Sequence, residues 1–145
     1  MNPHPFLLTP GTWLGEGKIQ LSMVEEELPF SMRWNVSQKD AMGSIECAQE
    51  VEVQGVNELM HNQFRFFDIT PSSFSVELEN EALGKVGGKG VIDDKLIAWE
   101  IRAASLGFEG FEVYEKQSNG SYAIRGEYAT DDQFRTTIMA HVWLQ

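Results

Sequence analysis

The arginines of this 145-residue chain are the side chains whose placement first suggests chemistry. All five fall inside segments that alternate apolar and polar residues, whereas the lysines lie mostly near turns. Arg65 shares one face of its segment with Phe67, and Arg135 shares a face with Met139 and Trp143. An arginine on a partly apolar face can hold a carboxylate through two parallel hydrogen bonds inside a cavity. We therefore expect Arg65 and Arg135 to be candidate anchors for an acidic ligand.

The last alternating segment leaves two orientations open, because its second face is the more uniformly apolar one. That face carries Ile138, Ala140, Val142 and Leu144. If it points inward, Arg135 and His141 lie outside and neither can reach an enclosed ligand. If the opposite face points inward, His141 joins Arg135 as a candidate ligand-binding residue.

Other patterns that carry chemistry are incomplete in this sequence. The histidines His4, His61 and His141 show none of the spacings of a zinc site. The glycine-rich segment 84–90 lacks the Ser or Thr of a phosphate-binding loop, and no helical pattern follows it. No G-x-S-x-G nucleophile motif is present, and Cys47 is expected to be a small buried apolar residue. We expect neither a metal site nor a nucleotide site.

Carboxylates are abundant but mostly follow polar faces. Glu46, Glu50 and Glu52 alternate with apolar residues, so we expect them to form a solvent-facing row. Glu100 and Glu112 stand alone within their segments, and neither has the sequence context that identifies a general acid or base. We expect no catalytic residue, although an enzyme that uses an internal cavity stays an alternative.

The segments that position these residues alternate with a period of two and are separated by turn residues, which is typical of antiparallel strands. The pattern starts at Trp13 and continues through Val53, and it then predicts strands over 60–69, 72–79, 83–92, 95–102, 108–117, 120–129 and 132–144. About ten consecutive strands leave two long edges unless the sheet closes. We expect one all-β domain over residues 1–145, an antiparallel closed or nearly closed barrel preceded by a leader at 1–10.

The first strand opens with the sequence Gly11-Thr12-Trp13-Leu14-Gly15-Glu16-Gly17. It resembles the G-x-W opening of calycin barrels, the group of lipocalins and fatty-acid-binding proteins, and is most similar to that of nitrobindins. The resemblance implies that Gly11 and Trp13 help to close one barrel end. It also implies a cation–π contact between Trp13 and a basic residue of the last strand, here Arg135.

Nitrobindins bind haem through a histidine on the last strand. The matching position falls on Thr136 or Thr137 in this sequence, and His141 lies farther along the same segment. The resemblance therefore offers haem binding through a shifted histidine as an alternative, whereas our own expectation is that no cofactor is bound.

A barrel of this size has room for one small molecule. We expect five aromatic residues to wall its pocket: Trp34, Phe64, Trp99, Tyr122 and Tyr128. The resulting hypothesis is non-enzymatic binding of a small hydrophobic or amphipathic, fatty-acid-like ligand. The alternatives are a haem protein, an enzyme that uses the same cavity, and a filled barrel that binds a partner.

Charge and composition limit the partners and the compartment. The formal net charge of -11 opposes binding to nucleic acid and to anionic membranes. No apolar run is long enough to cross a bilayer, and the leader lacks the basic residues of a signal peptide. A single cysteine, Cys47, excludes an internal disulfide and favours a reducing, cytoplasmic location. Nothing in the sequence indicates an oligomeric state.

Overall fold

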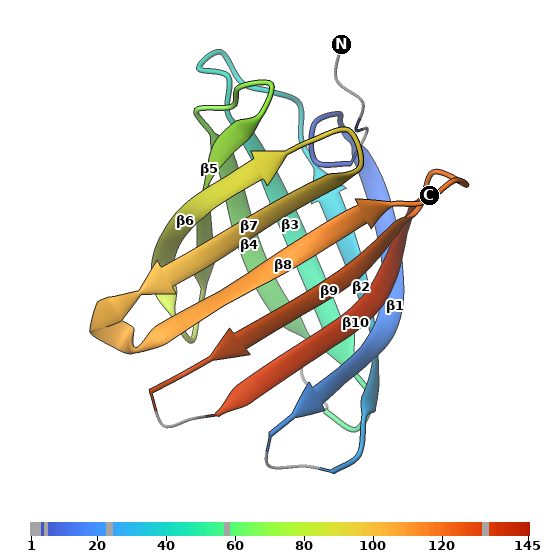
Figure 1. The fold of residues 1–145 in the computed structure, drawn as a ribbon, viewed down its shortest axis with the longest axis vertical. Coiled ribbons are helices and arrows are strands. Elements are labelled where there is room, and N and C mark those ends of the chain that lie inside the picture. The colour runs from blue at the N-terminus through green and yellow to red at the C-terminus, as the bar shows by residue number, and fades with distance from the viewer. Residues whose placement is uncertain (1–3, 5, 23–24, 57–58, 132–133) are drawn as a thin grey trace.

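The computed structural model describes residues 4, 6–22, 25–56, 59–131 and 134–145. Its described residues form ten strands: β1 (Gly11–Leu21), β2 (Leu28–Val36), β3 (Ile45–Val53), β4 (Met60–Phe67), β5 (Ser73–Asn80), β6 (Gly84–Ile92), β7 (Leu96–Ala103), β8 (Phe108–Lys116), β9 (Tyr122–Ala129) and β10 (Arg135–Leu144). Each strand pairs antiparallel with the next, and β10 pairs with β1 to close the barrel (Figure 1). The predicted all-β closed barrel is confirmed.

Period-two alternation explains why these segments form strands with one face toward a common core. In β2 the apolar residues Phe30, Met32, Trp34 and Val36 are buried, and the intervening residues from Pro29 to Asn35 are exposed. The predicted start of the last strand at residue 132 lies outside the described residues. In the described part of the chain, no helix is long and apolar enough to span a membrane.

The N-terminal segment closes one end of the barrel. Phe6 is fully buried, and its ring centroid lies 4.9 Å from that of Tyr114 and 5.0 Å from that of Trp13. His4 Nδ1 lies 2.8 Å from the hydroxyl of Tyr122, which ties the start of the chain to β9. The segment expected to be a leader is therefore a plug, formed by His4, Phe6 and Leu7, and Trp13 lies beneath it.

The predicted contact between Trp13 and Arg135 is wrong. In the β1–β10 register Trp13 is opposite Leu144, whereas Arg135 lies at the other end of β10, beyond the pair Leu21–Thr136. Arg135 is exposed and forms an ion pair with Glu127 of the neighbouring strand β9. Phe6 supplies the contact that a basic side chain was expected to make, because the N-terminal segment folds back over the barrel end.

The glycines in β1 and β6 allow close contacts between strands. A β-carbon on Gly17 would lie 2.2 Å from the carbonyl oxygen of Met139, and one on Gly90 would lie 2.1 Å from the ring of Phe74. Gly88 is equally restricted, since its β-carbon would lie 1.8 Å from the carbonyl oxygen of Glu100. Segment 84–90 is thus a strand without room for side chains at these positions, as expected from the failure of the phosphate-loop pattern.

Aromatic rings fill the half of the barrel beneath the plug. Trp99 stacks on Tyr114 with centroids 5.0 Å apart, and Trp34 packs on Phe64 at 4.9 Å. The indole nitrogens of Trp13 and Trp34 are buried and have no hydrogen-bond partner among the described residues. This dense half leaves the opposite half of the barrel for a cavity.

Candidate functional site

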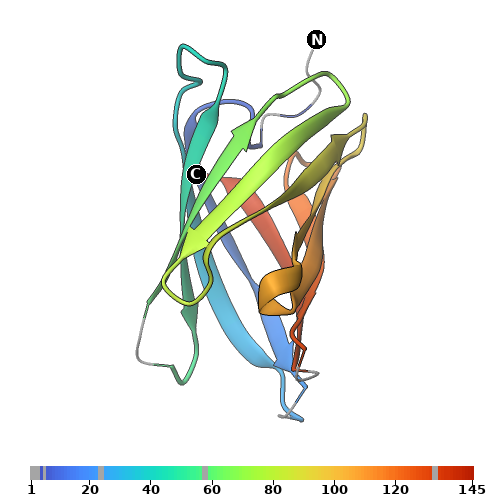
Figure 2. The ribbon, with the colours of Figure 1, turned by 90° about the vertical axis from the view of Figure 1, so that its left-hand side faces the viewer.

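A cavity of about 230 Å³ occupies the barrel end opposite the plug. Figure 2 shows this end, where β1 connects to β2 and β9 connects to β10, far from the N-terminal segment. Its apolar walls come from inward positions of seven strands and from one turn: Ile19, Phe30, Met32, Val51, Met60, Phe64, Leu78, Leu83, Phe108 and Ile138. Because these walls are mainly apolar, an apolar ligand that enters gains the free energy of leaving water.

Glu112 is the carboxyl side chain that lines this cavity among the described residues. It lies on β8 with only 6% of its surface exposed. Its Oε1 accepts a 2.9 Å hydrogen bond from the hydroxyl of Tyr114, and its Oε2 accepts a 2.5 Å hydrogen bond from the hydroxyl of Tyr128. Burial raises the pKa of Glu112, and the two hydrogen bonds partly oppose that effect because they stabilise the ionised carboxylate.

Glycines make room for this acidic cluster, which consists of Glu112, Tyr114 and Tyr128. A β-carbon on Gly126, which faces Glu112 in the β8–β9 register, would lie 2.9 Å from Glu112 Cγ. A β-carbon on Gly110 would lie 2.0 Å from the ring of Tyr128. The two glycines therefore let a carboxylate and a phenol lie side by side in the cavity wall.

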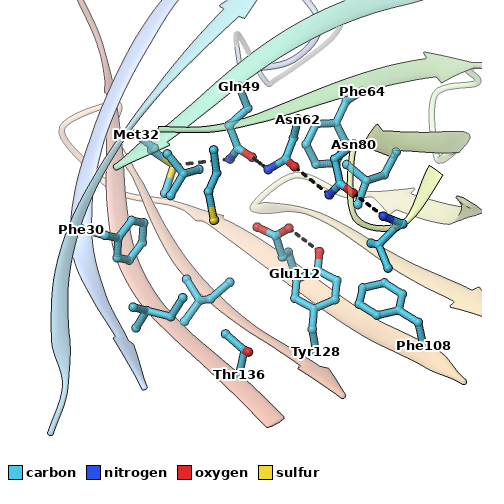
Figure 3. Close-up of a pocket in the computed structure, with 16 residues that line it drawn as sticks. Phe30, Met32, Gln49, Asn62, Phe64, Asn80, Phe108, Glu112, Tyr128 and Thr136 are labelled. Carbon is cyan, nitrogen blue, oxygen red and sulfur yellow. Dashed lines mark hydrogen bonds between the residues drawn. The ribbon is translucent and has the colours of Figure 1, made fainter. Parts of the chain in front are cut away.

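A row of three amide side chains lines the opposite wall (Figure 3). Asn62 Nδ2 donates to Gln49 Oε1 at 2.8 Å, and Asn80 Nδ2 donates to Asn62 Oδ1 at 3.0 Å. The row ends where the backbone N–H of Leu83 donates to Asn80 Oδ1 at 2.8 Å, which fixes the orientation of every amide. Each amide oxygen then accepts one hydrogen bond, and the amide nitrogen of Gln49 also donates to Met32 Sδ.

The predicted pocket walls divide between the cavity and the filled half. Phe64 and Tyr128 line the cavity, and Tyr128 stacks on Phe108 with ring centroids 5.5 Å apart. Trp34, Trp99 and Tyr122 are buried inside the barrel as expected, but they belong to the aromatic half beneath the plug and do not line the cavity.

The two arginines predicted to bind a ligand lie outside the barrel, so this expectation is wrong. Arg65 alternates with the inward residues Phe64 and Phe66; its guanidinium lies 3.1 Å from Glu77 and 4.4 Å from the ring centre of Phe67. Arg135 is likewise outside, on the side of β10 opposite to Thr136.

His141 is also on the outer face, as the sequence analysis allowed. It is exposed, and in the β1–β10 register it lies opposite Glu16, which is exposed too. The inward face of β10 is the more uniformly apolar one, and it contributes Thr136 and Ile138 to the cavity. His61 is exposed on β4, and the described residues contain no group of three or more potential metal ligands.

The sequence analysis missed the polar residues of the cavity. Glu112 has the same parity as Phe108 and Tyr114 in its strand, and Gln49 lies between Cys47 and Val51 on the buried face of β3. Parity alone thus places both on the inner face. Buried polar groups need hydrogen-bond partners. The bonds from Tyr128 to Glu112 and from Asn62 to Gln49 join different strands and have no signature in the sequence, whereas the bond from Tyr114 to Glu112 lies within β8.

Comparison with known proteins establishes the type of fold. No protein-family model matches the chain, and no curated protein sequence matches it significantly. A solved structure of an S-type phycobiliprotein lyase from Guillardia theta is similar, with a TM-score of 0.73 and 10% sequence identity. The match covers 100% of this chain and 93% of the lyase. At that identity the likeness concerns the fold alone, and the chain is a closed ten-stranded antiparallel barrel of the calycin-like type.

Proposed function

We propose that this protein binds one small, mainly apolar molecule in the cavity opposite the plug. The observation that carries the proposal is the uneven filling of the barrel: aromatic side chains fill one half, and a cavity of about 230 Å³ occupies the other. Burying apolar ligand surface there is worth about 25 cal/mol per Å². The acidic cluster and the amide row supply the few polar groups that orient a ligand in such pockets.

A fatty acid held by an arginine has no support from this cavity. Its described lining contains no Arg, Lys or His, because Arg65 and Arg135 point outward. A ligand carboxylate would instead meet the carboxyl group of Glu112, and two neighbouring carboxylates cannot both ionise cheaply. We therefore narrow the proposed ligand to an amphipathic molecule that is not an anion.

The described lining of the cavity has no histidine that could bind the iron of haem, as the nitrobindin resemblance would require. His141 lies on the outer face. The cavity volume also falls below the range of about 300–1,000 Å³ that is usual for larger ligands. The residues present do not fit haem, and the similarity to a phycobiliprotein lyase supports only the use of such a barrel for a small molecule.

An enzyme that uses the same cavity is the second candidate, and Glu112 is the specific observation in its favour. A buried carboxyl group with a raised pKa has the properties of a general acid. The binding function is preferred because the hydroxyls of Tyr114 and Tyr128 are engaged with Glu112. Among the lining residues that the structure describes, no cysteine, serine or lysine provides a nucleophile.

We further propose a cytoplasmic location, supported by the free and buried thiol of Cys47. The cavity makes the alternative of a filled, partner-binding barrel less suitable, since that function needs no internal space.

The binding function is tested with the neutral dye N-phenylnaphthylamine, whose fluorescence rises in apolar surroundings. We expect uptake at one site per chain. Thr136→Phe adds bulk to a cavity-lining position and should weaken uptake by about 10-fold or more. Thr137→Phe, on the exposed face of the same strand, is the matched control and should bind like the parent. Absence of uptake by the parent, or equal uptake by both variants, would contradict the proposal.

A further inference from the structure

Within the proposed binding function, on which this inference rests, the described lining of the cavity contains one carboxyl group, that of Glu112, and no Lys, Arg or His. We propose that the cavity selects ligands that carry a protonated amine on an apolar body, with the ammonium group received by the carboxylate of Glu112. The amine class follows from which atoms Glu112 still offers and from the charges around it.

Glu112 retains hydrogen-bonding capacity after its internal contacts are made. Each carboxylate oxygen can accept about two hydrogen bonds, and each receives one from a tyrosine: Oε1 from Tyr114 and Oε2 from Tyr128. Both tyrosines donate, so both stabilise the carboxylate as an acceptor and hold it in one orientation. Figure 3 shows the carboxyl group projecting into the cavity, below the amide row.

No Lys, Arg or His lies among the described residues that line the cavity around Glu112. Tyr114 on β8 and Tyr128 on β9 act on Glu112 directly, and Cys47 on β3 lies near Tyr114; each of the three is neutral when protonated. Trp99 is its neighbour in the β7–β8 register and does not titrate. Burial raises the pKa values of Tyr114, Tyr128 and Cys47, so all three stay protonated at neutral pH. An ammonium group would therefore supply the positive charge that the described lining lacks.

The overall charge of the protein favours the same class of ligand. The net charge of -11 attracts cations toward the barrel. A ligand carboxylate is repelled by Glu112, and a neutral alcohol forms a weaker hydrogen bond than an ammonium does. Specificity for amines thus arises because Glu112 attracts an ammonium group and repels a carboxylate.

Binding of an amine is coupled to proton release. Burial raises the pKa of Glu112, so part of the free protein holds a proton there that must leave for solvent when the ammonium group binds. A simple alkylamine, like lysine, stays protonated up to about pH 10. Amine affinity should therefore rise with pH through the pKa of Glu112, whereas alcohol affinity should not.

The test compares hexylamine, hexanol and hexanoate as competitors of N-phenylnaphthylamine, since the three share one alkyl chain. At about pH 8 we expect hexylamine to compete at a concentration about 10-fold or more below that of hexanol, with hexanoate the weakest. Glu112→Gln should remove the preference for the amine and its pH dependence while dye and hexanol still bind. Glu115→Gln changes an exposed residue on the outer face of β8 and should keep the preference for the amine and its pH dependence.

Tyr128→Phe covers the case in which Glu112→Gln does not fold. It keeps the carboxylate but removes one stabilising hydrogen bond, so the amine preference should persist and move to higher pH. Equal competition by the three probes, or an amine preference that survives Glu112→Gln, would overturn this inference while leaving the binding function intact. Failure of the parent to take up the dye would overturn both this inference and the proposed binding function.

Discussion

The hydroxyl of Tyr128 donates a 2.5 Å hydrogen bond to Oε2 of Glu112, joining β9 to β8 in the wall of the cavity. A carboxyl group in this position costs folding free energy when it ionises, because burial removes its hydration. The hydrogen bonds from Tyr128 and Tyr114 stabilise the carboxylate and so offset part of that cost. Ionisation of Glu112 is therefore linked to the stability of the barrel as well as to ligand binding.

We expect Glu112 to lower the stability of the protein as pH rises. Burial raises its pKa above the ordinary value of 4.5, so the folded state binds this proton more tightly than the unfolded chain does. The stabilisation is fully present below the ordinary pKa and is lost as pH rises through the raised pKa. Glu112→Gln has no such proton and does not lose stability in this way. The Tm of the variant minus the Tm of the parent should therefore increase between about pH 5 and about pH 9.

The control for this experiment is Glu115→Gln, which removes an exposed carboxylate from the same strand. Its Tm difference from the parent should stay nearly constant over the same pH range. A Tm difference for Glu112→Gln that is also independent of pH would show that Glu112 ionises in the folded protein as it does in the unfolded chain.

The barrel could be predicted from the sequence because alternation is a local property repeated along the chain, and because about ten consecutive strands leave two long edges unless the sheet closes. Phe30, Met32, Trp34 and Val36 mark β2 without any knowledge of other strands. The plug was not predicted, since the burial of Phe6 depends on residues far away in the sequence, such as Tyr114 and Tyr122, as well as on Trp13. A short apolar segment before a strand does not reveal where it will fold.

The site was harder to predict because the sequence analysis ranked residues by charge type before strand parity. Arg65 and Arg135 attracted attention as cations on partly apolar faces, yet both faces are outer faces with exposed apolar neighbours such as Met139. Glu112 was set aside as isolated although its parity matched that of buried residues. Its partnership with Tyr128 depends on the β8–β9 register and could not be derived from spacing.

Removing the plug residue Phe6 should destabilise the barrel strongly. Phe6→Ala deletes a fully buried ring that contacts Trp13, Trp34 and Tyr114, and such truncations cost about 3–5 kcal/mol. Phe111→Ala removes the same ring from an outward, partly exposed position and should cost far less. Urea unfolding followed by tryptophan fluorescence measures both. Equal losses would mean that the plug contributes no more than a surface residue does.

The thiol of Cys47 should be unreactive in the folded protein. It is fully buried, and burial raises its pKa to about 12, so almost no thiolate is present at neutral pH. A coloured disulfide reagent should therefore label it only as fast as the barrel opens, and labelling should become rapid in denaturant. Rapid labelling of the native protein at neutral pH would contradict the burial of this side chain.

The outer arginines should be dispensable for ligand binding. Arg65→Met and Arg135→Met remove ion pairs to Glu77 and Glu127 on the barrel surface, and neither change reaches the cavity. Dye affinity should stay within about twofold of the parent, because exposed ion pairs contribute little and no lining residue moves. Loss of dye binding in a folded arginine variant would show that the ligand contacts the outside of the barrel.

Replacement by alanine should lower the stability of the protein at one glycine of β6 and leave it nearly unchanged at another. A β-carbon on Gly90 would lie 2.1 Å from the buried ring of Phe74, so Gly90→Ala must displace that ring and should cost about 1–3 kcal/mol. Gly87 is exposed, and its β-carbon would lie 3.4 Å from the nearest atom, the carbonyl oxygen of Val76. Gly87→Ala should therefore change stability by less than about 0.5 kcal/mol. Chemical denaturation of the pair decides whether this glycine-rich segment exists for close packing: a mild effect at Gly90 would mean that Phe74 has free space to move into.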